Sequence, residues 1–285
     1  MRGVALPLEP EEQDELVTKR MLEYREFEED ELDKIKLPAY KNWYKEGFVT
    51  RPLDQGSCGG CWAFSAISTT ESLALMAGVE KELREYSIQQ LLECDTDNYG
   101  CTGGWMYQGF AYISQNGVLP RTQYTDFKRR TSECSTTNEL LDSEAVMKDI
   151  GYVEHDGRSN AQLKQLLMQQ PLSVGMYTTG MMSAYKTGVM TNDFLHCSYI
   201  DLEVNHGVVL VGFGKVNRGD RVRGRCREYW IVRNSWGPNW GEEGFMRICM
   251  DGTGSKNTPV GSCLINRYTT WPTMNKEDID PDFTI

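Results

Sequence analysis

Cys61 lies in a setting that favours nucleophilic chemistry. It follows Cys58 in a C-x-x-C spacing, after a glycine-rich turn, and Gln55 lies six residues upstream. The turn, followed by apolar residues at helical spacing over 62–76, predicts a helix that begins near Cys61. The partial positive charge at a helix N-terminus stabilises a thiolate and lowers the pKa of the thiol.

A C-x-x-C pair at a helix start has three interpretations: a redox dithiol, half of a metal site, or one structural and one catalytic cysteine. A thioredoxin-like protein is shorter and carries its dithiol after a strand. A zinc site needs a second ligand pair, and the sequence contains no other C-x-x-C and no H-x-x-x-H. The surroundings favour the third interpretation, with no metal and no cofactor, and leave an inert buried thiol as the alternative for Cys61.

Two later residues favour a catalytic Cys61 over an inert buried thiol. His206 opens an apolar run, and Asn234 ends another in Arg-Asn-Ser-Trp-Gly. Singly, each is ordinary, because a histidine beside a strand is often structural and an asparagine at a strand end often forms a turn. With Cys61 they follow the order of a nucleophile, a base and a residue that orients the base.

The composition narrows the class of protein. The 285 residues carry a net charge of −11, which argues against nucleic acid as a partner, and no apolar run is long enough for a membrane span. The first residues, Met1 to Pro10, lack the features of a signal peptide. Nine cysteines favour disulfides and therefore a lysosomal, vacuolar or extracellular protein, with eight paired and one left as a thiol.

The elements that must hold these residues change along the chain. Further helices are expected around Ser87 to Cys94 and Met106 to Gln115, whereas strands are expected over 172–176, 206–213, 229–233 and 244–248. The expected organisation is an acidic extension over 1–36, a helical half over 37–148, a β-rich half over 149–268 and an irregular tail over 269–285.

Two charged segments are candidates for partner binding. The acidic extension over 1–36 and the arginine-rich loop from Lys215 to Arg227 are each typical of a solvated surface. The alternative is that either segment binds a protein inhibitor or an assembly partner, the loop taking an acidic partner such as the chain's own extension.

Over about Leu37 to Tyr268 the chain resembles the papain and cathepsin L family of cysteine peptidases. The resemblance rests on four motifs in the family's order: Gln-Gly-Ser-Cys-Gly-Gly-Cys-Trp-Ala-Phe-Ser, Cys-Thr-Gly-Gly, Asn-His-Gly-Val-Val-Leu-Val-Gly-Phe-Gly, and Tyr-Trp-Ile-Val-Arg-Asn-Ser-Trp-Gly-Pro-Asn-Trp-Gly. It implies an α+β fold with a helical left domain, an antiparallel β-barrel-like right domain and an active site in the cleft between them.

The resemblance also implies roles for single residues. Cys61 is the thiolate, His206 its imidazolium partner and Asn234 the orienter of the imidazole, while Gln55 donates its amide to the oxyanion. Trp236 shields the bond between Asn234 and His206, although a core tryptophan is an equal alternative. The expected activity is that of a thiol-dependent endopeptidase that acts on polypeptides through an acyl-enzyme.

The disulfide pairing is likewise implied by the resemblance. It joins Cys58 to Cys101, Cys94 to Cys134 and Cys197 to Cys263. Cys226 and Cys249 remain, and because they flank two strands that the family pairs, a fourth bridge between them is reasonable.

The same comparison suggests substrate contacts. Gly103 and Gly104 hold the substrate backbone as an extended strand. The pocket for the residue two positions before the cleaved bond is apolar and without an acidic residue, which favours a bulky hydrophobic side chain over Arg. Its expected lining is Trp105, Met106, Gly175, Val204, Gly207 and Tyr268.

Three features depart from the family pattern. Gly60 stands where Ser or Ala is usual, the span from Cys61 to Asn234 is longer than usual, and Met1 to Lys36 is shorter than the family's inhibitory propeptide. An intact set of catalytic residues does not prove that they are used, and the alternative function is a catalytically silent, papain-like scaffold or accessory subunit of a larger assembly that keeps the same residues.

Overall fold

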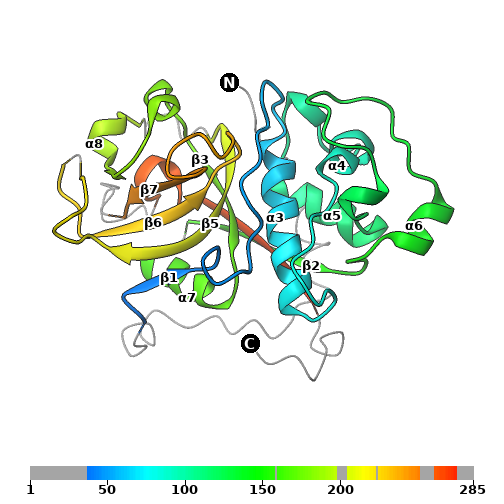
Figure 1. Ribbon diagram of the computed structural model, residues 1–285, viewed down its shortest axis with the longest axis horizontal. Coiled ribbons are helices and arrows are strands. Elements are labelled where there is room, and N and C mark those ends of the chain that lie inside the picture. The colour runs from blue at the N-terminus through cyan, green and yellow to red at the C-terminus, as the bar shows by residue number, and fades with distance from the viewer. Residues whose placement is uncertain (1–36, 158, 198–203, 223, 251–259, 275–285) are drawn as a thin grey trace.

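Helices and a large sheet lie side by side, and the helix that begins at Cys61 runs between them (Figure 1). The computed structural model describes residues 37–157, 159–197, 204–222, 224–250 and 260–274. The helices are α3 (Cys61–Met76), α4 (Ile88–Cys94), α5 (Met106–Asn116), α6 (Asn138–Glu144), α7 (Asn160–Gln169) and α8 (Asn192–Leu195), with short 3₁₀ turns η2 (Gly100–Thr102), η3 (Arg121–Gln123), η4 (Gly180–Ala184) and η5 (Ser262–Leu264).

The sheet has the strand order β2-β8-β3-β5-β6-β7-β4, and β1 pairs with β5 beside this path. All pairings are antiparallel except that of β4 with β7. The strands at the two ends of the order, β2 and β4, do not pair with each other, so the described sheet is open and the barrel-like expectation needs correction. The strands are β1 (Tyr40–Asn42), β2 (Gly151–Asp156), β3 (Leu172–Met176), β4 (Val189–Met190), β5 (His206–Lys215), β6 (Glu228–Arg233), β7 (Phe245–Cys249) and β8 (Tyr268–Thr273).

The central helix α3 is buried on all sides, and only Leu75 among its residues is partly exposed rather than buried. Its many Ala, Ser and Thr side chains are small enough for strands and helices to approach it closely. The Ser65 hydroxyl donates to the carbonyl of Val208 at 2.8 Å, and Thr69 Oγ1 lies 3.1 Å from Ser173 Oγ. These bonds fix α3 against β5, which begins at His206, and against β3, which ends at Met176 opposite His206.

Two hydrophobic cores lie on either side of α3. One contains the inward side chains of β3, β5, β6 and β7, and the other packs α3 against α4 and α5. No single position in the sequence divides the residues of one core from those of the other. Trp43 and Val49 precede α3 but belong to the sheet-side core, and β1 pairs with β5. The chain thus crosses to the sheet before it forms α3.

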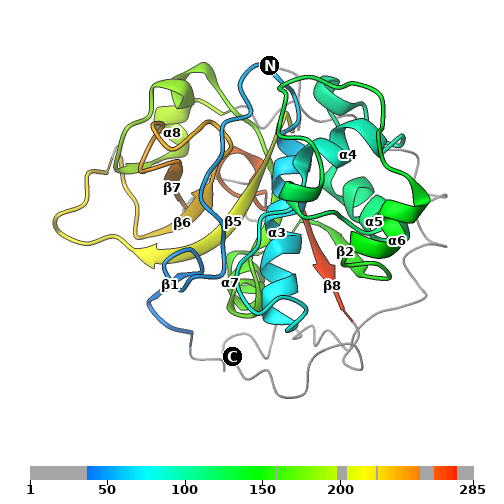
Figure 2. The ribbon, with the colours of Figure 1, turned by 45° about the vertical axis from the view of Figure 1, so that its right-hand side comes forward.

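The residues after Tyr268 differ from the expectation of an irregular tail. Tyr268–Thr273 forms β8, which pairs with β2 and β3, and Figure 2 shows it as the red arrow next to β2. Thr270 is buried, and its hydroxyl donates to the carbonyl of Val153 at 2.8 Å. Threonine is common in strands, so a polar composition was a poor guide here. The expected tail beyond 274 lies outside the described residues, as does the acidic extension over 1–36.

Four disulfides join the eight cysteines other than Cys61: Cys58–Cys101, Cys94–Cys134, Cys197–Cys263 and Cys226–Cys249. Such bonds persist in oxidising compartments, and the protein fits that setting. No helix in the described ranges is long and apolar enough to cross a membrane.

Candidate active site

Cys61 is the first residue of α3 and is buried against the start of β5. The backbone N–H of Gly207 donates to Cys61 Sγ at 3.3 Å. A Cβ at Gly207 would lie 3.0 Å from Met106 Sδ and 3.4 Å from the backbone of Trp62, so glycine lets β5 approach the helix start closely. The contact places the Cys61 thiol next to Gly207, which directly follows His206.

His206 and Asn234 meet across neighbouring strands. His206 begins β5 and Asn234 directly follows β6, and β5 and β6 pair antiparallel with Val209 opposite Arg233. His206 Nε2 lies 2.8 Å from Asn234 Oδ1, which leaves Nδ1 as the other nitrogen of the ring. The Trp236 ring lies over His206 at a centroid distance of 5.1 Å, and both His206 and Asn234 are buried. The Trp236 ring therefore packs against the imidazole that makes this hydrogen bond.

Gln55 is held by both ends of its amide. Its Nε2 donates to the carbonyl of Cys58 at 2.8 Å, and its Oε1 accepts a short hydrogen bond from the Ser235 hydroxyl. An amide nitrogen has two N–H groups, so a second donor is available beside the first. The N–H of Cys61 lies in the first turn of α3. Two donors thus lie near the thiol.

A cleft of about 550 Å³ is lined by Cys61, His206 and Gln55 among others. Asn205 and Thr178 at its edge were not anticipated from the sequence: Asn205 Oδ1 accepts from Thr178 N at 2.7 Å and from Thr178 Oγ1 at 2.9 Å. The position of Asn205 directly before His206 was the available signal. The described lining is Gln55, Gly56, Ser57, Cys58, Gly59, Cys61, Cys101, Thr102, Thr178, Asn205, His206 and Trp236.

The residues expected to contact substrate form a second group next to this lining. Gly175 pairs with Gly207 and with Tyr268, and a Cβ on it would lie 2.7 Å from Val204 Cγ1. Trp105 meets Tyr268 edge to face at a centroid distance of 5.2 Å. Met106 is buried against Gly207, and all six expected pocket residues therefore lie close together.

Gly103 and Gly104 are buried, and Gly104 lies beside Asn98 and Trp62. Any side chain at Gly104 would collide with Asn98, because its Cβ would lie 2.1 Å from Asn98 Oδ1. Asn98 in turn accepts from the backbone N–H of Trp105 at 2.6 Å. The glycine is thus required by packing, in addition to the backbone contact expected from the sequence.

Burial acts against charges at the two titratable groups. It raises the pKa of the Cys61 thiol to about 11, against the smaller lowering effect of the Gly207 N–H. It lowers the pKa of the His206 imidazole to about 4, although the bond to Asn234 acts in the opposite direction. These directions oppose the thiolate expected from the helix dipole and the imidazolium implied by the resemblance. An ion pair here must therefore depend on the attraction between its two members.

A thiol, an imidazole oriented by an amide and two nearby N–H donors are suited to acyl transfer. Helices packed against a mostly antiparallel sheet, with these groups where the two meet, define a papain-like fold.

The chain belongs to the papain family of cysteine proteases, whose profile matches residues 37–273. It is 32% identical to zingipain-2 of Zingiber officinale over 83% of this chain and 96% of that protein. It is 35% identical to cysteine proteinase EP-B 1 of Hordeum vulgare over 84% of this chain. The match spans 61% of the Hordeum protein, less than two thirds of its length.

Solved structures agree with the fold. The bromelain protease from Ananas comosus, in complex with an inhibitor, superposes with a TM-score of 0.69 at 30% identity, over 84% of this chain and all of that one. The proform of the ragweed pollen protease Amb a 11 gives a TM-score of 0.71 at 30% identity, over 85% of this chain and 68% of that one.

Proposed function

We propose that this chain is a thiol-dependent endopeptidase that hydrolyses peptide bonds through an acyl-enzyme on Cys61. The observation that carries the proposal is the convergence of three groups. The N–H of Gly207 holds Cys61 Sγ, and the neighbouring His206 is oriented by Asn234. In this proposal the half over 37–148 supplies the nucleophile and the half over 149–268 supplies the histidine and the asparagine.

The proposed reaction has two stages. The Cys61 thiolate attacks the carbonyl carbon, and the resulting oxyanion accepts hydrogen bonds from the Gln55 amide and the Cys61 N–H. As the intermediate collapses, the C–N bond breaks and imidazolium His206 gives its proton to the leaving amine. A water molecule then loses a proton to His206 and attacks the thioester. The C–S bond breaks and the acid is released, which restores the Cys61 thiolate beside imidazolium His206. Asn234 keeps the ring in place throughout.

Burial of Cys61 and His206 supplies an argument for the alternative function. Each ion alone is costly in this site. A proton that moves from Sγ to the imidazole leaves the net charge of the site unchanged, and each new charge lies beside its opposite. If this attraction outweighs desolvation, the protein is a protease; if it does not, it is a catalytically silent scaffold.

The rate of thiol alkylation against pH separates the two functions. For the ion pair, an epoxide that reacts with thiolates alkylates Cys61 at mildly acidic pH, well below the value of about 8.5 for an ordinary thiol. Peptidase activity then has a bell-shaped dependence on pH. It falls at low pH because the thiolate is protonated, and it falls at high pH because the imidazolium loses its proton. A neutral pair gives the opposite result, with alkylation that rises only as pH approaches the thiol value of about 11. That outcome would support the scaffold function.

The apolar pocket predicts substrate preference. None of its six residues is acidic, and Arg267 lies over the Tyr268 ring at 5.5 Å, which adds a positive charge nearby. A buried guanidinium without a partner is costly, so peptides with Leu or Phe two residues before the cleaved bond should exceed those with Arg by on the order of 10²-fold in kcat/KM.

Matched peptides that differ only at this position provide the measurement. Val204→Asp should lower the ratio of kcat/KM for Leu or Phe peptides to that for Arg peptides, because the new carboxylate faces the guanidinium of the substrate. Val204→Asn adds polarity without charge and is the control. Equal cleavage of Leu and Arg peptides by the unmodified protein would contradict the pocket assignment.

The arginine-rich loop is our proposed surface for an acidic protein inhibitor or assembly partner. Acidic residues near it already have partners, since Asp220 pairs with Arg247, and Glu228 pairs with Lys164 at 2.8 Å. The Cys226–Cys249 disulfide ties the loop to β7. The arginines therefore present positive charge to solvent at Arg218, Arg221 and Arg225. We further propose a lysosomal, vacuolar or extracellular location, which the four disulfides support.

A further inference from the structure

A buried pair of opposite charges lies behind the candidate site and has no part in the proposed reaction. Arg233 is the last residue of β6 and directly precedes Asn234, and Glu71 lies on α3, which begins at Cys61. Each residue is 4% exposed. Buried charges are costly unless they are paired and hydrogen-bonded, so the contacts of Arg233 and Glu71 decide how both are tolerated here.

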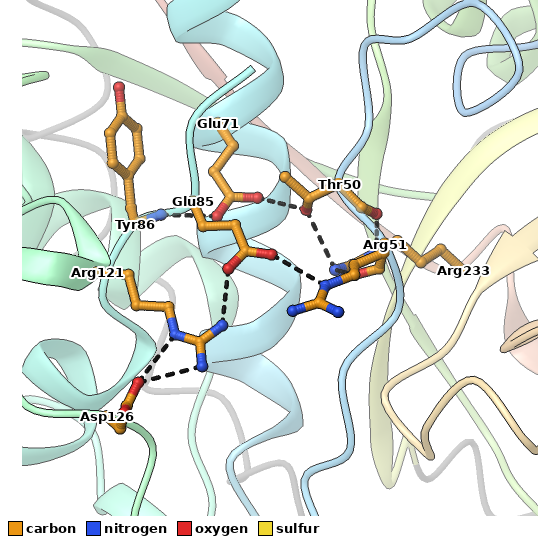
Figure 3. Close-up of polar contacts among 8 residues, drawn as sticks. All are labelled: Thr50, Arg51, Glu71, Glu85, Tyr86, Arg121, Asp126 and Arg233. Atoms are coloured by element: carbon orange, nitrogen blue, oxygen red, sulfur yellow. Dashed lines mark hydrogen bonds and ion pairs between the residues drawn. The ribbon is translucent and has the colours of Figure 1, made fainter. Parts of the chain in front are cut away.

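Arg233 is held by the backbone of a segment that crosses from the sheet to the helices. Its Nε donates to the carbonyl of Thr50 at 3.0 Å, and its Nη2 donates to the carbonyl of Arg51 at 2.9 Å and to Thr50 Oγ1 at 3.3 Å. Figure 3 shows Thr50 between Arg233 and Glu71. A planar guanidinium with several donors is required for this pattern, since an ammonium cannot reach all three acceptors in the same geometry.

Thr50 passes the contact on to α3. Its hydroxyl donates to Glu71 Oε2 at 2.6 Å, and the backbone N–H of Tyr86 donates to Glu71 Oε1 at 2.8 Å. Both carboxylate oxygens of Glu71 therefore accept, which is the pattern of the ionised form. The chain Arg233–Thr50–Glu71 connects the end of the strand before Asn234 to the helix that begins at Cys61.

A second branch of the network reaches the surface. Glu85 accepts from Arg51 Nε at 3.3 Å and from Arg121 Nη1 at 2.7 Å, and Arg121 also pairs with Asp126 (Figure 3). The Arg51 side chain is 70% exposed. Exposed ion pairs contribute little, so this branch supplies a comparison for the buried one.

We infer that Arg233 is a positioning residue for Asn234, and that the buried chain through Thr50 to Glu71 sets the place of Asn234 and His206 relative to Cys61. The inference rests on the proposed function, in which Asn234 orients the imidazole. Asn234 itself is held by its N–H to the carbonyl of Gly244 at 3.0 Å and by the N–H of Ser235 on its Oδ1 at 2.8 Å. These local bonds do not connect it to α3, whereas the Arg233 chain does.

Arg233→Lys tests the inference because it keeps the buried charge but loses the fork of donors. We expect kcat to fall by on the order of tenfold with KM within about twofold, since a displaced orienter affects the chemical step more than substrate binding. Arg51→Lys is the matched control: it makes the same change on the exposed branch and keeps the backbone carbonyl that Arg233 uses. It should leave kcat unchanged.

The ring signals of the histidines give a second measurement that does not depend on activity. The chain has three histidines, His155, His196 and His206. In NMR spectra Arg233→Lys should move the His206 ring resonances and leave those of the other two in place, and Arg51→Lys should move none.

Burial raises the pKa of Glu71 to about 7 despite the Thr50 hydrogen bond and the Arg233 charge, which lower it, and nearby Glu85 raises it further. The spectra are therefore compared above that pH.

A double-variant cycle separates positioning from general stability. If Arg233 acts through Asn234, adding Arg233→Lys to Asn234→Ala should lower kcat no further than Asn234→Ala does alone. Additive losses, or a folded Arg233→Lys with normal kcat and normal His206 signals, would overturn the inference. If Arg233→Lys does not fold, Thr50→Val, which keeps both charges and the side-chain shape, takes its place in the same measurements.

The histidine spectra also keep this inference distinct from the proposed function. A protein without peptidase activity whose His206 signals move in Arg233→Lys, but not in Arg51→Lys, would fail the proposed function and keep the structural connection. If the unmodified protein is an active peptidase, but Arg233→Lys changes neither its kcat nor its His206 signals, the proposed function stands and the inference about Arg233 fails.

Discussion

Cys61→Ala should abolish peptide hydrolysis and epoxide labelling together. The acyl-enzyme needs a sulfur at this position, and loss of an enzyme's nucleophile lowers kcat by on the order of 10⁶-fold. The other eight cysteines are in disulfides, so the unmodified protein should take up one equivalent of label. Intact mass after labelling, without reductant, measures that stoichiometry directly.

Cys61→Ser is the matched variant for this experiment. It keeps a small side chain with a hydrogen-bond acceptor for the Gly207 N–H, while a hydroxyl is far less nucleophilic than a thiolate. It should fold as the unmodified protein does and remain inactive. Activity in a folded Cys61→Ala protein, or label on any other residue, would contradict the proposed nucleophile.

The sequence predicted the elements that carry the proposed catalytic residues because their signals are local. A glycine-rich turn followed by helical periodicity placed the start of a helix at Cys61, and α3 spans Cys61–Met76. The apolar runs after His206 and before Asn234 became β5 and β6, with ends within a residue or two of the expected ones. In each case the chemical residue sits at the end of an element, where composition changes sharply.

Other features depend on contacts between distant segments and could not be predicted in this way. Thr50 and Arg233 are 183 residues apart, and nothing near either residue indicates their hydrogen bond. The Cys61 and His206 pKa directions likewise depend on burial by the whole fold, which no local sequence pattern records. The open sheet follows from which strands pair, and strand order is not encoded in the pattern of any one strand.

Gln55→Ala should lower kcat by about 10²–10³-fold, the loss expected when one donor to an oxyanion is removed. The amide of Gln55 is aligned by its bonds to the carbonyl of Cys58 and to the Ser235 hydroxyl, so the donor is fixed before substrate binds. KM should change little, because the oxyanion exists only after attack on the carbonyl.

Alkylation of Cys61 by a simple alkyl halide supplies the control, since that reaction forms no oxyanion and needs only the thiolate. Gln55→Ala should therefore lose peptidase activity while it keeps the alkylation rate of the unmodified protein. Gln55→Glu should be at least as inactive, because its carboxylate has no N–H to donate and places a negative charge where the oxyanion forms. Ser235→Ala removes one of the two bonds that align the amide and should lose less activity. Equal losses of alkylation and hydrolysis in Gln55→Ala would mean that Gln55 supports the thiolate or the fold, and its role as an oxyanion donor would be wrong.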